Sequence, residues 1–244
     1  MIEVDIIILS YAKTKELKEI TQQAIVTCLS SENPENISFN ILVIESDRSI
    51  PPYQFERTTT IYPEVSFGFN KFLNIGILQT SAKYLCLCNN DLIFHKNWAS
   101  EILEEFARYP NLLSANPYCD RFDYDRRIVD HANVVFKKDN MSINGVLTGW
   151  CIFVERTVLN QIGPLDERFE FWYADNDYDL TLQKHKIEHA LIKSSKVTHL
   201  ACQSHSTLGK KLDEMTIGQR KIFDKKWNKR SIWKRLYSKI SKAK

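Results

Sequence analysis

The chain has 244 residues, 43% of them hydrophobic and 26% charged, with a formal net charge of +3. This length and composition suit a globular protein with one larger domain, or one domain with an appendage. They exclude a membrane-spanning protein, because every apolar run is far shorter than a bilayer, and long flexible linkers, because Gly and Pro number only seven each.

The six cysteines indicate a reducing environment. They form no Cys-x-x-Cys pair, and most lie in apolar runs, where a free thiol behaves as a small hydrophobic side chain. The N-terminus lacks the basic and apolar regions of a signal peptide. We therefore expect a cytoplasmic protein with reduced core cysteines, without a disulfide framework or a zinc site.

The first fifty residues predict a βαβ unit. Residues 4–9 are a β-branched run, residues 15–29 repeat apolar side chains at helical spacing, and residues 41–44 are apolar again. The order strand, helix, strand implies two parallel strands with a right-handed crossover. The first strand ends in Ser10-Tyr11 and the second in Glu45-Ser46-Asp47, so these polar groups are expected to share one edge of a sheet.

Strands and helices continue to alternate along the rest of the chain, which predicts an α/β fold. Residues 120–130 are polar and are expected to form a surface loop. Further strands are predicted at 58–62, 84–88, 112–116, 134–136, 150–154 and 196–198, and helices at 68–77, 97–109, 157–162 and from about residue 179.

The stretch 84–94 is the centre of the functional argument. Its apolar run ends abruptly in Asn89-Asn90-Asp91 and then becomes apolar again. Open α/β sheets bind ligands at the carboxyl ends of their strands, and the Asp91 carboxylate suits a divalent cation. The alternative is a plain strand followed by a turn, since Asn and Asp are ordinary turn residues.

Two further segments carry candidate catalytic groups. Residues 166–180 mix acids with aromatics, so desolvation is expected to raise the pKa of a carboxylate, which is one way to build a general base. Asp177 is expected near the start of a helix there, and an acidic helix N-terminus without a catalytic role is the alternative. The last predicted strand ends at His199. This histidine is structural unless Asp91 lies nearby, because imidazole together with carboxylate suits Mn²⁺.

In order and spacing, these motifs resemble those of the GT-A glycosyltransferases over residues 4–228, in particular the inverting family 2 with its rhamnosyltransferase-like members. Several positions depart from the family pattern: Asn89 and Asn176 replace acids, and Leu9 replaces a proline. Leu73 stands where many relatives carry an arginine, for which Lys71 is a weak substitute. The matching segments are the strand ends at Ser10-Tyr11 and Glu45-Ser46, Gly68-Phe69-Asn70 with Asn74-Ile75-Gly76, Asn89-Asn90-Asp91 in place of Asp-x-Asp, Gly149-Trp150-Cys151 in place of Gly-Ala, residues 162–169, Asn176-Asp177-Tyr178-Asp179-Leu180 in place of Glu-Asp-x-Asp-Leu, and Phe223-Asp224-Lys225-Lys226-Trp227.

The resemblance implies a GT-A fold, which is a Rossmann-like nucleotide-binding α/β domain with a central, mainly parallel mixed sheet flanked by helices. Residues 1–91 would form the nucleotide-sugar-binding half of a catalytic domain 1–228, and residues 92–228 the acceptor-binding half. The implied activity is the transfer of a sugar, with inversion, from a nucleotide-diphosphate sugar to an acceptor hydroxyl on a glycan of a surface polysaccharide or glycoconjugate.

The resemblance also implies a role for each motif residue. Asp177 is the implied general base, with Asp175 and Asp179 as alternatives, and Asp91 with His199 is the implied ligand pair for Mn²⁺ or Mg²⁺ beside the diphosphate. The implied acceptor-binding residues are Trp150, Trp172 and Tyr173. The implied donor-binding residues are Ser10, Tyr11, Glu45, Asp47, Lys71, Asn74, Asn89 and Asn90.

Other functions, and the role of the tail, stay open. The missing acids support a non-catalytic carbohydrate- or nucleotide-sugar-binding relative, whereas a sugar nucleotidyltransferase would need a Gly-rich triphosphate loop that residues 10–13 lack. Residues 220–244 hold eleven Lys or Arg against one acid, and no motif that would indicate nucleic-acid binding. Residues 229–244 are either a helix on the inner face of an anionic membrane, near a lipid-linked acceptor, or a basic extension that is solvated or packed on the acidic body.

Overall fold

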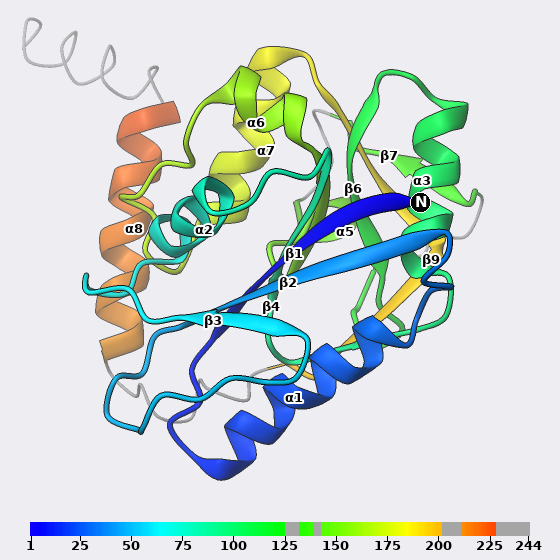
Figure 1. The fold of residues 1–244 in the computed structure, drawn as a ribbon. Helices are drawn as coiled ribbons and strands as arrows, with labels where there is room; N and C mark the ends of the chain where they lie inside the picture. Colours follow the sequence, from blue (N-terminus) through cyan, green and yellow to red (C-terminus); the bar gives the residue numbers. More distant parts are fainter. Residues whose placement is uncertain (125–131, 139–142, 202–210, 228–244) are drawn as a thin grey trace, which may run out of the picture.

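The computed structural model describes residues 1–124, 132–138, 143–201 and 211–227, and it has the predicted α/β architecture (Figure 1). The strands are β1 (Ile2–Ser10), β2 (Ile37–Glu45), β3 (Thr58–Ile61), β4 (Tyr84–Asn89), β5 (Leu92–Phe94), β6 (Leu112–Tyr118), β7 (Val134–Phe136), β8 (Cys151–Glu155) and β9 (Glu188–His199). The helices are α1 (Lys15–Leu29), α2 (Phe69–Leu78), α3 (Trp98–Arg108), α5 (Ile143–Val146), α6 (Arg156–Ile162), α7 (Ala174–His185) and α8 (Lys211–Trp227).

Nine strands in the described part of the chain form one mixed sheet, in the order β3-β2-β1-β4-β8-β6-β9-β5, with β7 paired to β9. The half that contains β3, β2, β1 and β4 is parallel throughout, whereas β8 runs antiparallel to β4 and β6. The predicted parallel pairing of the first two strands is confirmed, with Ser10 opposite Glu45. The carboxyl ends of β1, β2 and β4 therefore lie at one edge of the sheet.

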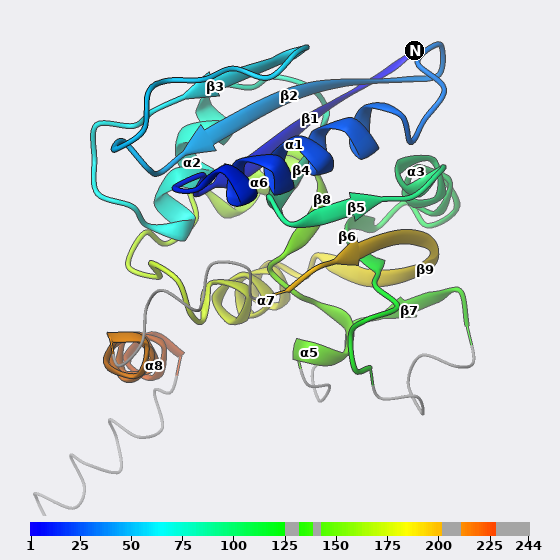
Figure 2. The ribbon, with the colours of Figure 1, turned by 90° about the horizontal axis from the view of Figure 1, so that it is seen from below.

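Helices cover both faces of the sheet, which is why its strands are apolar on both sides. Ile6 and Ile8 of β1 pack in one core with α1 and α3, and Ile7 and Leu9 pack in a second core with α2, α6 and α7. Successive side chains of a strand point to opposite faces, so the β-branched run of β1 contributes to both cores. Figure 2 shows α1 lying along β1 and β2, and α8 at the side of the molecule next to α7.

Several predicted elements differ in extent from the observed ones, among them β2, which begins at Ile37 and not at residue 41. α7 begins at Ala174, earlier than predicted. Asp and Asn are weak helix formers, which argued for a later start, but acids are favourable in the first turn of a helix. Asp177 lies in that first turn, as expected. β9 covers residues 188–199, whereas only 196–198 were predicted. A shift of register between β6 and β9 falls after Ile192, and such an irregularity hides the alternation that predicts a strand.

The described cysteines lie in the protein core, as predicted. Cys28, Cys86, Cys88, Cys119 and Cys151 are buried and form no disulfide. Burial raises the pKa of the Cys86 and Cys88 thiols well above the ordinary value, so these thiols are protonated and unreactive at neutral pH.

Several predictions concern residues outside those described. They are Cys202, residues 125–130 of the expected surface loop, and the basic tail 229–244. Within the described ranges, no helix is both long and apolar enough to cross a membrane.

A buried polar network joins β6, β9 and α7. His189 lies on β9, with Nδ1 2.9 Å from the Ser114 hydroxyl and Nε2 2.9 Å from Asn116 Oδ1. The Tyr178 hydroxyl of α7 lies 2.9 Å from the same Ser114 hydroxyl. Burial lowers the pKa of His189 to about 3, so the imidazole is neutral at physiological pH.

We expect this histidine to make stability depend on pH. Its folded pKa of about 3 lies below its unfolded value of about 6.5, so it contributes stability that is complete above the unfolded pKa and is lost as the pH falls toward the folded one. His189→Gln keeps a donor and an acceptor but does not titrate. Between neutral and mildly acidic pH, its melting temperature should fall less steeply than that of the wild type. The control His185→Gln, at a partly exposed position, should follow the wild type, and equal slopes for all three proteins would contradict the expectation.

Candidate active site at the carboxyl edge of the sheet

The ends of β4 and β9 bring two predicted metal ligands together. Asp91 immediately precedes β5, and β5 pairs with β9 so that Leu92 lies opposite His199. The backbone N–H of Leu200 also donates to the Asp91 carbonyl oxygen at 2.9 Å. As a result, His199 Nε2 lies 3.2 Å from Asp91 Oδ1. His199 therefore lies near Asp91, which is the condition for interpreting it as a metal ligand.

A divalent cation fits this pair of side chains. Asp91 is only 7% exposed, and its Oδ1 is a buried oxygen without a hydrogen-bond partner. Buried polar atoms are nearly always satisfied, so an oxygen of this kind indicates a ligand site, and carboxylate with imidazole is a donor set that suits Mn²⁺. Among the described residues, no group of three or more His, Cys, Asp or Glu could hold a metal. Within the described residues, the candidate metal site therefore consists of Asp91 and His199 alone.

Trp150 lies against this pair. Its ring stacks on the imidazole of His199, with 5.4 Å between ring centroids and 13° between the planes. Its carbonyl oxygen accepts a hydrogen bond from the backbone N–H of Asn89 at 3.0 Å. Trp150, an implied acceptor-binding residue, therefore packs against His199 of the candidate metal site.

One hydrogen-bond chain connects three of the implied donor-binding residues. The Asn90 amide donates to the Thr21 hydroxyl at 2.8 Å, and Thr21 lies 3.1 Å from the Ser10 hydroxyl. The Ser10 hydroxyl lies 3.2 Å from the Tyr53 hydroxyl, which donates to Glu45 Oε2 at 2.5 Å. The chain thus runs beneath the strand ends through Thr21 and Tyr53. The sequence reasoning missed both, because neither stands at a strand end.

Glu45 is fully buried, and its carboxylate organises the loops that follow β1 and β2. It accepts hydrogen bonds from the backbone N–H groups of Ala12 and Asp47, besides that from Tyr53. Burial and this carboxylate raise the pKa of the Tyr53 phenol far above its ordinary value. Asp47 in turn accepts from the backbone N–H and the hydroxyl of Ser49. In this conformation, Glu45 and Asp47 hold the loops at this edge of the sheet in place through hydrogen bonds to backbone N–H groups.

The implied donor-binding residues on α2 make contacts of a different kind. The Asn74 amide donates to the Leu165 carbonyl oxygen at 2.9 Å and to Glu167, and its own oxygen accepts from the Leu165 N–H. Lys71 Nζ lies 3.3 Å from the Ser66 carbonyl oxygen. Asn74 therefore attaches the loop after α6 to α2. Tyr11 and the Asn89 side chain stay half-buried at the ends of β1 and β4.

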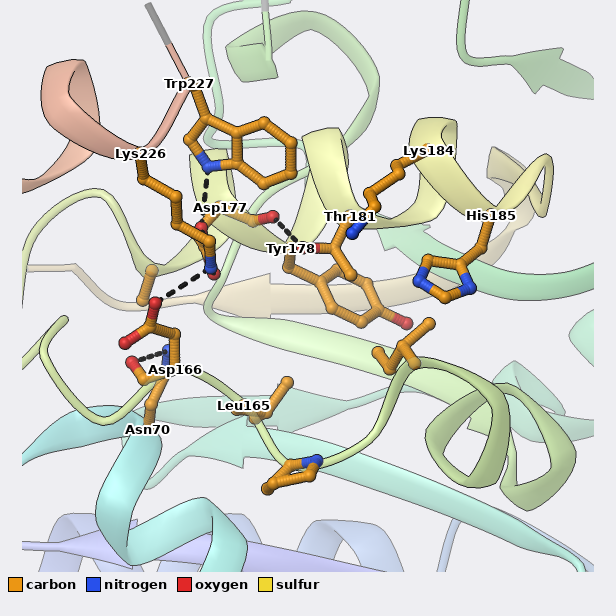
Figure 3. A pocket seen from close by; sticks show the side chains of 13 residues that line it. Asn70, Leu165, Asp166, Asp177, Tyr178, Thr181, Lys184, His185, Lys226 and Trp227 are labelled. Atoms are coloured by element: carbon orange, nitrogen blue, oxygen red, sulfur yellow. Dashed lines mark hydrogen bonds and ion pairs between the residues drawn. The ribbon is translucent and has the colours of Figure 1, made fainter. Parts of the chain in front are cut away.

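The predicted base, Asp177, is held by the C-terminal helix (Figure 3). It is 4% exposed, and its carboxylate accepts from the Trp227 indole N–H at 2.7 Å and from Lys226 Nζ at 2.9 Å. Lys226 also donates to Asp166 at 2.8 Å. Arg168, together with Lys226, holds the pKa of Asp166 well below its usual range. Asp166, Asp177, Lys226 and Trp227 line one wall of a cavity of about 140 Å³ between α7, α8 and the loop after α6.

The two alternative acids of α7 have different surroundings. Asp175 lies against Gly149, where an added Cβ would be 3.4 Å from the Cβ of Asp175. Burial raises the pKa of Asp175, which favours its protonated form. Asp179 is buried and forms an ion pair with Lys137 at 3.2 Å, where both side chains are 4% exposed. Asp179 is thereby committed to joining α7 to the segment after β7.

The two aromatic residues before α7 pack on other aromatic rings. Tyr173, in the left-handed conformation with φ of 63°, precedes the helix, and its ring lies 5.3 Å from that of Phe223 on α8. The Trp172 ring lies 5.2 Å from that of Phe171. Tyr173 therefore helps to dock α8, and an acceptor role for these two rings stays a prediction.

The fold is shared with known glycosyltransferases, although no family model and no curated protein matches the sequence. The structure of GalNAc-T7 with UDP, GalNAc and Mn²⁺ superposes with a TM-score of 0.64 at 10% identity, over 82% of this chain and 43% of that one. The mannosyltransferase PcManGT from Pyrobaculum calidifontis, in complex with GDP-Man and Mn²⁺, gives 0.58 at 11% identity, over 82% and 57%. The chain thus spans about half the length of these two proteins. The predicted GT-A fold is confirmed.

We expect Lys226 to anchor α8. Lys226→Met removes the cation between Asp166 and Asp177, and losing one partner of such a part-buried pair should cost about 1–3 kcal/mol of the free energy of unfolding. Urea unfolding measures this loss, and limited proteolysis should cut α8 faster in the variant. Lys225→Met, at an exposed position on the same turn, is the matched control. If both variants unfold at the same urea concentration, the ion pairs of Lys226 do not hold α8.

Proposed function

We propose that this protein is a metal-dependent glycosyltransferase that moves a sugar from a nucleotide-diphosphate sugar to an acceptor hydroxyl. The observation that carries the proposal is the Asp91–His199 pair, with its unsatisfied buried oxygen, at the carboxyl edge of a GT-A sheet. The donor class is supported by the two fold neighbours, whose structures hold UDP or GDP-Man together with Mn²⁺.

Asp91 and His199 are the proposed holders of a divalent cation, Mn²⁺ or Mg²⁺. Such a cation, when bound, offsets the negative charge that develops on the departing nucleoside diphosphate. Among the described residues, the proposed donors are one carboxylate and one imidazole, because Asn89 stands where the family pattern has a second acid. The loops after β1 and β2, held in place by Glu45, are the proposed wall for the nucleoside.

An acid in the first turn of α7 is the proposed general base. It takes the proton of the acceptor hydroxyl as the oxygen attacks the anomeric carbon from the face opposite the leaving group, which inverts that carbon. Asp177 matches the base of the resembling family, and in this conformation Trp227 and Lys226 already donate to it. Asp175 is the alternative, since burial raises its pKa and it lies against Gly149, next to Trp150.

The proposed acceptor is a sugar hydroxyl of a glycan or a lipid-linked saccharide, and the proposed location is the cytoplasm. Attachment to the inner face of a membrane would depend on residues 229–244, which lie outside the described residues. That part of the proposal rests on the charge of the tail alone.

A panel of nucleotide-sugars tests donor binding. At a concentration about 100 times Kd, the correct donor with Mn²⁺ should add about 2.7 kcal/mol, which is a rise of roughly 5–10 °C in melting temperature. Asp91→Asn should abolish the Mn²⁺-dependent part of the rise, while Asp123→Asn, at an exposed acid, should keep it. A rise of the same size in Asp91→Asn would contradict the metal assignment. Hydrolysis of the stabilising donor with Mn²⁺ distinguishes an enzyme from a binding protein.

Isosteric variants of the two acids test the base. Asp177→Asn should lower kcat by about 10²–10⁴-fold, as the loss of a general base does, with donor-induced stabilisation unchanged. Asp175→Asn is measured in parallel, and Lys226→Met separates loss of the base from loss of the α8 contact. If Asp177→Asn keeps near-normal turnover and Asp175→Asn does not, the base is Asp175. Product stereochemistry by NMR tests inversion.

A further inference from the structure

Trp150 is a bulky residue in a place where the family pattern has a small one. The resembling segment reads Gly-Ala, and here it reads Gly149-Trp150. The side chain is only 6% exposed and stacks flat on the imidazole of His199. Trp150 is therefore a feature of this chain and not of the family pattern. It contacts His199, one of the two residues proposed to hold the metal.

The sheet fixes the indole relative to Asp91. Asn89 donates its backbone N–H to the Trp150 carbonyl oxygen at 3.0 Å, and Cys88 pairs with Cys151 in the antiparallel β4–β8 ladder. Trp150 is thus attached to the same strand end that carries Asp91. His199 is the last residue of β9, and a ring at the end of a strand has freedom about its side-chain torsions unless packing removes it. The stacked indole supplies that packing.

The indole also carries an unused donor. Trp150 Nε1 is buried and has no hydrogen-bond partner, and Asp91 Oδ1, which lies 3.2 Å from His199 Nε2, has none either. Buried polar atoms of native proteins are rarely left unpaired. Both residues contact His199, and an unpaired donor together with an unpaired acceptor fits one ligand that brings both an oxygen and a cation. A nucleoside diphosphate with its metal has this chemistry.

We propose that Trp150 is a positioning residue for the metal ligand His199, and that its indole N–H donates to an oxygen of the bound nucleoside diphosphate. This inference rests on the proposed function. The flat face of Trp150 holds the imidazole with Nε2 toward Asp91, in a motif that has one carboxylate instead of two. The N–H contributes to nucleotide binding separately from the face.

Two variants separate the face from the N–H. Trp150→Phe keeps a flat ring and removes the donor, whereas Trp150→Leu removes the flat face as well. Mn²⁺ binding is followed through the EPR signal of free Mn²⁺, with and without UDP or GDP. Trp150→Leu should weaken Mn²⁺ binding by about 10–100-fold, the usual effect of losing a residue that orients a metal ligand. Trp150→Phe should bind Mn²⁺ alone within about twofold of the wild type and bind the Mn²⁺–nucleotide several-fold more weakly, as expected for one lost hydrogen bond.

Asp91→Asn and His199→Ala distinguish failure of this inference from failure of the proposed function. If neither variant changes Mn²⁺ binding, the metal site of the proposed function is wrong. If both weaken it and Trp150→Leu does not, only the positioning role is wrong. Equal nucleotide affinity in Trp150→Phe and the wild type would remove the role of the N–H. Circular dichroism confirms folding, and Trp150→Met, which lacks a flat face but keeps bulk, replaces the Leu variant if that protein does not fold.

Discussion

The antiparallel pairing of β5 with β9 is the constraint on which the candidate site depends. It places Leu92 opposite His199 and Phe94 opposite Val197, so two residues far apart in the sequence become neighbours through backbone hydrogen bonds. The sheet thereby positions both residues: His199 ends β9, and Asp91 lies in the two-residue connection between β4 and β5. Trp150, on the neighbouring strand connection, adds a side-chain restraint to the same geometry.

Helical geometry divides the acids of α7 between different tasks. Residues two apart on an α-helix point about 200° apart, so Asp175 and Asp177 face different neighbours. Asp177 meets α8 through Trp227, and Asp175 lies against Gly149 at the edge of the sheet. Asp179 returns to the side of Asp175 but is paired with Lys137. Asp177, the acid for which we propose the role of general base, is thus also the one that docks α8.

The parts predicted correctly from the sequence are those set by local patterns. The parallel pairing of the first two strands follows from strand, helix, strand order. Asp91 and His199, whose metal role stays a prediction, were selected because each follows a strand-like run, and the structure places them side by side. The irregular start of β9 was missed because a register shift disrupts its alternation. Contacts that exist only after folding left no local signal. Examples are the hydrogen bond from Trp227 to Asp177 and the one from the Tyr53 hydroxyl to Glu45. In each case, the sequence pattern of one segment does not indicate which other segment it contacts.

The unsatisfied atoms argue that this edge is a binding surface and not merely a strand end followed by a turn. An unpaired buried acceptor or donor typically costs about 1–3 kcal/mol, and Asp91 Oδ1 and Trp150 Nε1 both belong to this class. A plain turn would satisfy its own Asn and Asp side chains, as Asp47 does with Ser49 in the loop after β2. Asn90 forms a hydrogen bond within the fold, to Thr21, whereas Asp91 Oδ1 forms none and lies 3.2 Å from His199 Nε2. Within one three-residue motif, the fold therefore uses the Asn90 amide for its own structure and brings the Asp91 carboxylate to an imidazole.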